Sequence, residues 1–130
     1  MRSADVIEKV TARHPELLLP HKYQLLGPLC CIKQPDVRWH IAPMLARLPL
    51  NEEEKDAVVK VLLGFTYDTS SIVRTAAMQA LGDIAVHSPQ HLPEVMGVIE
   101  NLTLTGTPAM KARGRKLIAA LTKMPQCKQP

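Results

Sequence analysis

The residues of this chain most suited to chemistry are its five histidines, which could bind a metal ion or carry a proton. His87 and His91 have the i, i+4 separation that places two metal ligands on one face of a helix. The segment between them, Ser88-Pro89-Gln90, is typical of a turn. We therefore expect no metal site at this pair.

The three cysteines are the next residues with intrinsic reactivity. Cys30 and Cys31 are neighbours and Cys127 lies far along the chain, so their spacing predicts no disulfide framework. We expect Cys30 to be a small buried apolar side chain. Scarce, unpaired cysteines fit a reducing compartment, and we expect a cytoplasmic protein.

Motifs that carry catalysis or hold a cofactor are missing from the sequence. It contains no HExxH, GxSxG, CxxC, GxGxxG or Walker loop. Its Ser, His and Asp residues have no spacing that predicts a nucleophile beside a base. We therefore expect a protein that is not an enzyme and that uses no cofactor.

Charge is distributed unevenly along the 130 residues, which hold 16 Lys and Arg against 12 Asp and Glu, a net charge of +4. From Thr105 to Pro130 there are six cations and no acid, giving +6, and the preceding residues hold ten cations and twelve acids, giving −2. The candidate anion-binding residues in this segment are Lys111, Arg113, Arg115 and Lys116. The alternative is that they form the solvated outer face of a terminal helix.

Membrane insertion is not expected from the hydropathy pattern. No stretch approaches the roughly 18 to 20 consecutive apolar residues that a membrane span needs. Residues 1–14, MRSADVIEKVTARH, place charges in every helical turn instead of forming an apolar signal core.

The elements that must position these side chains are predicted to be helices. Apolar residues recur at helical spacing, and no run alternates with period two for long enough to suggest a sheet. We expect one domain over residues 1–123, with helix pairs at about 3–31, 35–66 and 70–104, a terminal helix at 108–123, and a polar tail at 124–130. Within the first pair, the prolines of the HPELLLP segment are expected to break the helix before a second begins near Pro20.

Three helix starts have clear sequence signals. Asn51 precedes the acidic run Glu52-Glu53-Glu54, which suits a cap and the positive end of a helix dipole. The following helix is expected to start near Ser70 or Ser71, and Thr107 with Pro108 can cap and open the last one.

An internal repeat connects these helices. Residues 37–45, 73–81 and 110–118 align without gaps, at offsets of 36 (73 minus 37) and 37 (110 minus 73). Each segment has an apolar residue followed by a cation, a small or apolar residue at plus four, and an apolar residue at plus eight. Ala77 and Gly114 at plus four suit a close contact between helices.

The stretch from Asp68 to Ala85, DTSSIVRTAAMQALGDIA, resembles the first helix of a HEAT repeat. The matching features are an Asp, an Arg preceded by Val six residues later, and a closing Ala-Leu-Gly. The likeness is good in residues 35–48 and partial in 108–122. It implies an all-α, right-handed α-α superhelix, a solenoid of about seven antiparallel-paired helices. The offset is shorter than the usual ~40 to 47 residues, which leaves an armadillo-like or irregular repeat open.

The resemblance also implies roles for particular residues. Cations at the repeated position, Arg38, Arg74 and Lys111, would form a ladder with acids of the same or adjacent repeats, of which Asp36, Asp68 and Asp83 are the candidates. Trp39 is expected in the core or between repeats.

In solenoids of this kind the second helix of each pair lines the concave face. The solvent-facing residues of the two helices at 52–66 and 92–104 are then the candidate partner-binding set: Glu53, Asp56, Lys60, Glu94, Glu100 and Asn101.

The function implied by this resemblance is a scaffold that binds an unidentified protein or peptide. The alternative is a nucleic-acid-binding module that uses the basic C-terminal helix, although four aromatic residues offer little for base stacking. A third possibility is self-association through the solenoid ends, which expose apolar surface unless a polar cap covers them.

Overall fold

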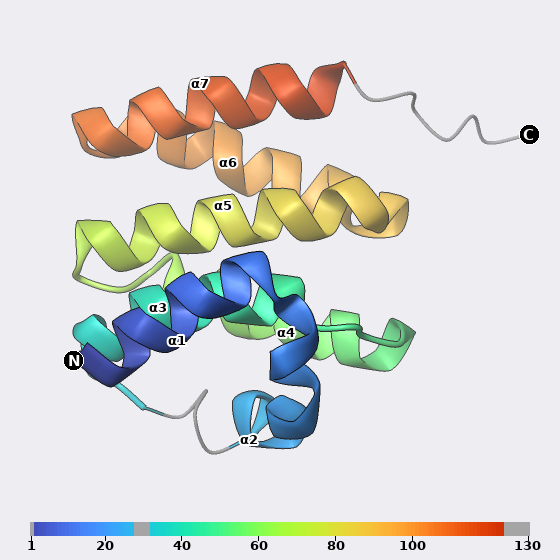
Figure 1. Ribbon diagram of the computed structural model, residues 1–130. Coiled ribbons are helices and arrows are strands. Elements are labelled where there is room, and N and C mark those ends of the chain that lie inside the picture. The colour runs from blue at the N-terminus through green and yellow to red at the C-terminus, as the bar shows by residue number, and fades with distance from the viewer. Residues whose placement is uncertain (1, 28–31, 124–130) are drawn as a thin grey trace, which may run out of the picture.

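The computed structural model describes residues 2–27 and 32–123, and over these ranges the chain is helical with no β-strand (Figure 1). The α-helices are α1 (Arg2–Arg13), α2 (Lys22–Leu26), α3 (Pro35–Arg47), α4 (Glu52–Phe65), α5 (Ser71–His87), α6 (Leu92–Thr105) and α7 (Pro108–Thr122). Two 3-10 helices, η1 (Pro15–His21) and η3 (Pro89–His91), join α1 to α2 and α5 to α6. The predicted all-α class is confirmed.

The first helix pair is interrupted where the prolines predict a break, because α1 ends at Arg13. The unexpected feature is that Pro15–His21 form the 3-10 helix η1 within this break, before α2 begins at Lys22. Leu18, which is 2% exposed, holds η1 against the core. The predicted end of this pair, with Cys30 and Cys31, lies outside the described residues, as do Cys127 and the predicted tail.

The helix starts follow their sequence signals. Asn51 and Glu54 form a capping box, in which the Glu54 N–H donates to Asn51 Oδ1 at 2.8 Å and the Asn51 N–H donates to Glu54 Oε1 at 3.0 Å. The side chains of Ser70 and Thr107 accept hydrogen bonds from Val73 and Met110 at the starts of α5 and α7. The predicted caps at Asn51 and Thr107 and the predicted helix start near Ser70 or Ser71 are confirmed.

The odd-numbered helices pack against one another in the order of the sequence. α1 contacts α3, α3 contacts α5, and α5 contacts α7, while α4 packs on α5 and α6 packs on α7 and α5 (Figure 1). The apolar faces that the repeat predicts lie between these helices: Val37 and Leu45 on α3, Val73 and Leu81 on α5, and Met110 on α7 are all buried.

Polar contacts between helices have a regular sequence separation. The bonded pairs are 30 to 39 residues apart, close to the repeat offsets of 36 and 37. They are Glu8 and Thr11 with Arg47, Arg38 with Asp68, Glu52 with Gln90, Asp56 with His91, Ser71 with Thr107, and Gln79 with Arg113. Each of these bonds therefore joins one helical unit to the next along the chain.

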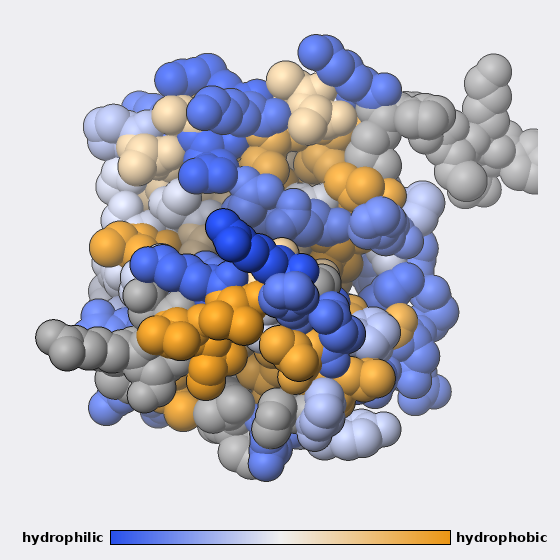
Figure 2. Space-filling view, viewed as in Figure 1, coloured by the Kyte–Doolittle hydropathy of each residue, from blue (hydrophilic) through white to orange (hydrophobic). Residues whose placement is uncertain are grey.

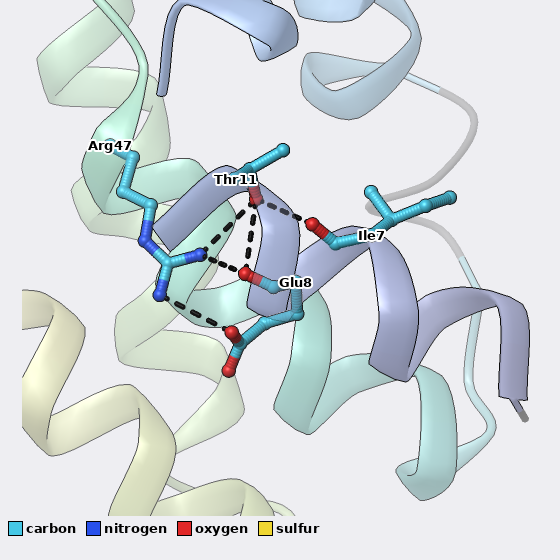
Figure 3. Close-up of polar contacts among 4 residues, drawn as sticks. All are labelled: Ile7, Glu8, Thr11 and Arg47. Carbon is cyan, nitrogen blue, oxygen red and sulfur yellow. Dashed lines mark hydrogen bonds and ion pairs between the residues drawn. The ribbon is translucent and has the colours of Figure 1, made fainter. Parts of the chain in front are cut away.

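Arg47 makes the polar connection between α1 and α3 (Figure 3). Its Nη1 donates to the Glu8 carbonyl at 2.9 Å and to Thr11 Oγ1 at 3.3 Å, and its Nη2 lies 3.4 Å from Glu8 Oε2. The Thr11 hydroxyl, in turn, donates to the Ile7 carbonyl at 2.7 Å. A single guanidinium thus binds both the backbone and a side chain of α1.

Gly114 allows a close approach of α7 to α6. A Cβ atom at this position would lie 1.8 Å from Thr103 Oγ1, far inside van der Waals contact. The close helix contact predicted for Gly114 is confirmed.

The first helices of the chain carry an exposed apolar surface, which we call the N-terminal apolar face. Figure 2 shows hydrophobic residues gathered over α1. The exposed residues of this face are Val6, Ile7 and Val10 on α1, Leu17 and Leu19 on η1, and Tyr23 on α2. Among the described residues, no helix combines the length and apolar character that crossing a membrane requires.

Candidate functional site

A groove of about 600 Å³ lies where the α4–α5 connection meets α6. We call it the Arg74 groove. Its lining residues are Thr66, Tyr67, Asp68, Arg74, Pro93, Glu94, Gly97, Val98, Asn101 and Leu102. Two of them, Glu94 and Asn101, belong to the predicted partner-binding set.

The α4–α5 connection is fixed by its own hydrogen bonds. The Thr66 hydroxyl donates to the Leu63 carbonyl at 2.5 Å, and Asp68 Oδ1 accepts from the Ser70 N–H at 2.8 Å. Tyr67 between them is 88% exposed, so its ring stands at the mouth of the groove. The groove therefore has an ordered wall and an exposed aromatic ring available to a ligand.

Beside this groove, Arg38 forms the first ion pair of the predicted ladder. Its Nη1 lies 2.8 Å from Asp68 Oδ2, and the Asp68 side chain is only 8% exposed. Its Nε donates to the Ile32 carbonyl at 2.9 Å, and its guanidinium lies 4.8 Å from the centre of the Phe65 ring. Asp68, one of the three candidate acids, is thus the partner of Arg38.

Arg74 occupies the equivalent position in the next repeat but makes no such pair. Its Nε is buried and has no hydrogen-bond partner within residues 2–27 and 32–123. Lys111 likewise has no ion pair there, Asp36 is exposed, and Asp83 accepts from Gln79 instead. Among the described residues, the Arg38–Asp68 pair is therefore the part of the predicted ladder that forms. In the sequence, the residue equivalent to Asp68 in the next repeat is Thr105, which is not an acid.

The other predicted partner-binding residues lie on the exposed surface of α4 and α6. Glu53, Lys60 and Glu100 are exposed but outside the groove. Asp56 is 62% exposed, and its Oδ1 lies 2.6 Å from His91 Nε2. The structure thus brings Glu94 and Asn101 together in the groove and leaves Glu53, Asp56, Lys60 and Glu100 elsewhere.

His91 is a contact that sequence reasoning missed. The turn predicted between His87 and His91 argued against a metal site at this pair. In the structure α5 ends at His87, before His91. His91 follows Asp56 by 35 residues, which is close to one repeat length. This sequence separation could have predicted the pair. Within the described ranges, no three His, Cys, Asp or Glu side chains converge as a metal site would require.

Glu54 has a second partner besides its cap. Lys22 Nζ on α2 lies 2.7 Å from Glu54 Oε1. This ammonium group, together with the Asn51 N–H, lowers the pKa of Glu54 from its ordinary value of 4.5. One carboxylate therefore caps α4 and ties it to α2.

A second, smaller groove of about 330 Å³ crosses the surface of α3, α5 and α7. Its apolar residues include Trp39, which is partly buried against the core and packs on the His40 ring at 3.7 Å between centroids. At its polar edge Gln79 donates to Asp83 at 2.9 Å and accepts from Arg113 Nη1 at 2.8 Å. Burial raises the pKa of Asp83 from its ordinary value of 3.8. The position of Trp39 agrees with the expectation that it packs in the core or between repeats.

The predicted anion-binding residues are distributed around α7. Arg113, Arg115 and Lys116 are exposed, and Lys111 is partly buried. Because Arg113 is bonded to Gln79, it faces α5, and the structure gives Arg115 and Lys116 no bond to other described residues.

Comparison with protein-family models, with curated proteins and with solved structures finds no match to this chain.

Proposed function

We propose that this chain is a non-enzymatic scaffold of HEAT-like helical repeats that binds a protein or peptide along its second-helix surface, formed by α4 and α6. The observation that carries this proposal is the Arg74 groove, since Glu94 and Asn101 line it together with an exposed tyrosine. Tyrosine and arginine are the side chains most often found at the centre of protein interfaces.

The stacking of the helices supports the solenoid part of the proposal. The odd-numbered helices α1, α3, α5 and α7 pack in sequence, each on the next, and the polar contacts between helices span 30 to 39 residues. In a solenoid each repeat contacts only its neighbours, so one repeat length separates the residues in contact. The resulting extended surface is what such proteins use for binding.

The test is a selection of peptides from a display library against the immobilised full chain. Affinities of the selected peptides are then compared between the wild type and a variant with Glu94→Lys and Asn101→Lys. Both residues are exposed, so the fold should be unaffected, and we expect binding to weaken at least about tenfold.

The matched control carries Arg115→Glu and Lys116→Glu on the exposed surface of α7. It should bind the selected peptides as the wild type does. Peptides that lose affinity for this control and keep it for the α6 variant would overturn the proposal.

A nucleic-acid-binding module is the second candidate, favoured by the exposed Arg113, Arg115 and Lys116 on α7. Phosphate binding by such cations would give an affinity that falls steeply with salt. A titration of double-stranded DNA and of RNA over salt concentration decides this candidate. No affinity at low salt eliminates it, and a steep salt slope that is lost in the Arg115→Glu, Lys116→Glu variant supports it.

A further inference from the structure

The three repeated helices share one register at their starts. The N-cap residues are Gln34 for α3, Ser70 for α5 and Thr107 for α7. The repeated cation follows each cap by four residues, so Arg38, Arg74 and Lys111 are structurally equivalent.

The first of these cations shows what the position does. Arg38 reaches to the next repeat and pairs with Asp68, which lies two residues before the cap of α5. By the same register, Arg74 should reach to the residue two before the cap of α7, and that residue is Thr105. A threonine hydroxyl cannot neutralise a guanidinium, and this hydroxyl already donates to the Asn101 carbonyl at 2.9 Å.

Within the part of the chain that the structure describes, Arg74 thus has a buried Nε without a hydrogen-bond partner and forms no ion pair. Asp68 also lines the groove, but its two oxygens are engaged by Arg38 and by the Ser70 N–H. Glu94 lies at the groove with an exposed side chain and forms no ion pair with Arg74 in the described part of the chain. A partly buried guanidinium without a carboxylate is unfavourable, since its hydration is reduced and nothing replaces it.

We propose that the Arg74 groove binds a carboxylate group of a partner peptide, which supplies the acid missing from the second rung. The inference rests on the proposed function, because the peptide would reach Arg74 across α6. Arginine donates to carboxylates through two parallel N–H groups, which gives the site geometric specificity. Glu94, which also lines the groove, would repel a doubly charged phosphate more strongly than a singly charged carboxylate.

The remaining lining suits an apolar residue beside that carboxylate. Pro93, Val98 and Leu102 present apolar surface, and the Tyr67 ring is exposed at the mouth. The bound group is therefore a single carboxylate next to an apolar side chain. It can come from the C-terminus of a peptide or from an Asp or Glu side chain.

The experiment follows the Arg74 Nε–H signal of the full chain by NMR during titration with small probes. N-acetyl-leucine carries a terminal carboxylate, and N-acetyl-leucinamide is its neutral counterpart. N-acetyl-aspartamide with a free side-chain carboxylate, paired with N-acetyl-asparaginamide, tests the second source. We expect saturable shifts with at least one acid, at least about tenfold tighter than with its neutral counterpart. Equal responses to the acid and neutral forms of both pairs would overturn the inference.

Two variants make the test specific to the missing rung. Thr105→Asp supplies the acid within the chain, on the same face of α6 as Asn101, because residues four apart in a helix share a face. It should shift the Arg74 signal without any probe and abolish the response to the acids. Thr105→Asn has a similar size and no charge, and it should keep the wild-type response. Unchanged binding of the acids by Thr105→Asp contradicts the inference.

A third variant, Arg74→Gln, lacks the Arg74 signal, so its response is measured by the backbone amide signals of residues 94 to 102. These signals should no longer respond to the acids.

Failure of this inference can be distinguished from failure of the proposed scaffold function. Display-selected peptides could require Glu94 and Asn101 for binding yet bind equally well when they carry no carboxylate. This result would support the scaffold function and contradict carboxylate binding by Arg74.

Discussion

Gly114 and Gly97 are both helical glycines, but their surroundings differ completely. A Cβ atom on Gly114 would collide with the Thr103 side chain, whereas one on Gly97 would meet nothing within 4 Å. Thr103 cannot simply rotate away, because its hydroxyl donates to the Ile99 carbonyl at 2.6 Å. The close contact between α6 and α7 therefore depends on Gly114 having no side chain.

Gly114→Ala is expected to lower the free energy of unfolding by about 1–3 kcal/mol, since overpacking forces the helices apart. Gly97→Ala should raise it by roughly 0.5–1 kcal/mol, because alanine has the higher helix propensity. Urea unfolding of both variants measures the difference. Adding Thr103→Ala to Gly114→Ala should restore part of the loss, and an absence of any recovery would mean that Thr103 is not the obstacle.

Glu54 makes stability depend on pH. Its pKa is lowered in the folded state, so its contribution is present above the ordinary pKa of 4.5 and is lost as the pH falls through the lower folded value. We expect the wild type to lose stability in this acidic range and Glu54→Gln to lose less. Glu53→Gln, on the exposed side of the same turn, should keep the wild-type slope. Thermal unfolding between pH 3 and pH 7 compares the three proteins, and parallel curves for all of them would contradict the assignment.

Residue roles were predictable from the sequence where a local pattern determines them. The cap at Asn51 and the close contact at Gly114 follow from neighbouring residues and from the repeat. The family resemblance named Arg38 as a ladder cation and Asp68 as one of three candidate acids, but the structure is what pairs them. The pair formed by His91 and Asp56 was not predicted, since it needs the three-dimensional stacking of two units.

At the scale of the elements, α1 is held less securely than the central helices. One of its faces is exposed at Val6, Ile7 and Val10, and Arg47 supplies its polar contact with α3. Helices with few buried contacts open locally at low free energy. The attachment of α1 is therefore expected to depend strongly on one side chain.

Arg47→Met should keep the apolar stem of the residue and remove its hydrogen bonds to Glu8 and Thr11. We expect amide hydrogen exchange in α1 to accelerate by about tenfold or more, consistent with the loss of roughly 1.5–3 kcal/mol per charged hydrogen bond. Amides of α6 and α7 should be unaffected. Lys60→Met, an exposed cation on α4, is the control. Equal acceleration throughout the chain would argue against local opening of α1.

The pair formed by α3 and α4, the pair formed by α5 and α6, and the terminal helix α7 begin and end within one residue of the predicted bounds, because caps and prolines mark them. The 3-10 helix η1 was not predicted, since its two prolines suggested a break. Proline at the start of a helix removes no hydrogen bond, and a 3-10 turn accommodates a second one at Pro20.

At the scale of the whole molecule, exposed apolar side chains are distributed unevenly over the surface. We predict that copies of this chain associate through the N-terminal apolar face. Six exposed large apolar side chains belong to the N-terminal apolar face, which lies at one end of the stack of helices. Apolar patches of this kind are uncommon on monomers unless they bind something. The helical class was predictable from composition and periodicity, but this patch was not, because the same residues could have been buried.

Sedimentation velocity over a range of protein concentrations tests this surface. We expect the wild type to sediment faster as concentration rises, and a variant with Ile7→Glu and Leu19→Glu to sediment as a monomer throughout. Leu104→Glu changes an exposed apolar residue far from this face and should leave the association intact. A wild type that stays monomeric at all concentrations, or a loss of association in Leu104→Glu, would contradict the prediction.

The sequence separation of the polar contacts between helices also bears on how the chain folds. Each contact closes a loop of only 30 to 39 residues, whatever its position in the chain. The entropy lost in loop closure depends on loop length, so no step of assembly requires the two ends of the chain to meet. Lengthening the chain by a further helical unit would add surface without lengthening the loop that any existing contact must close.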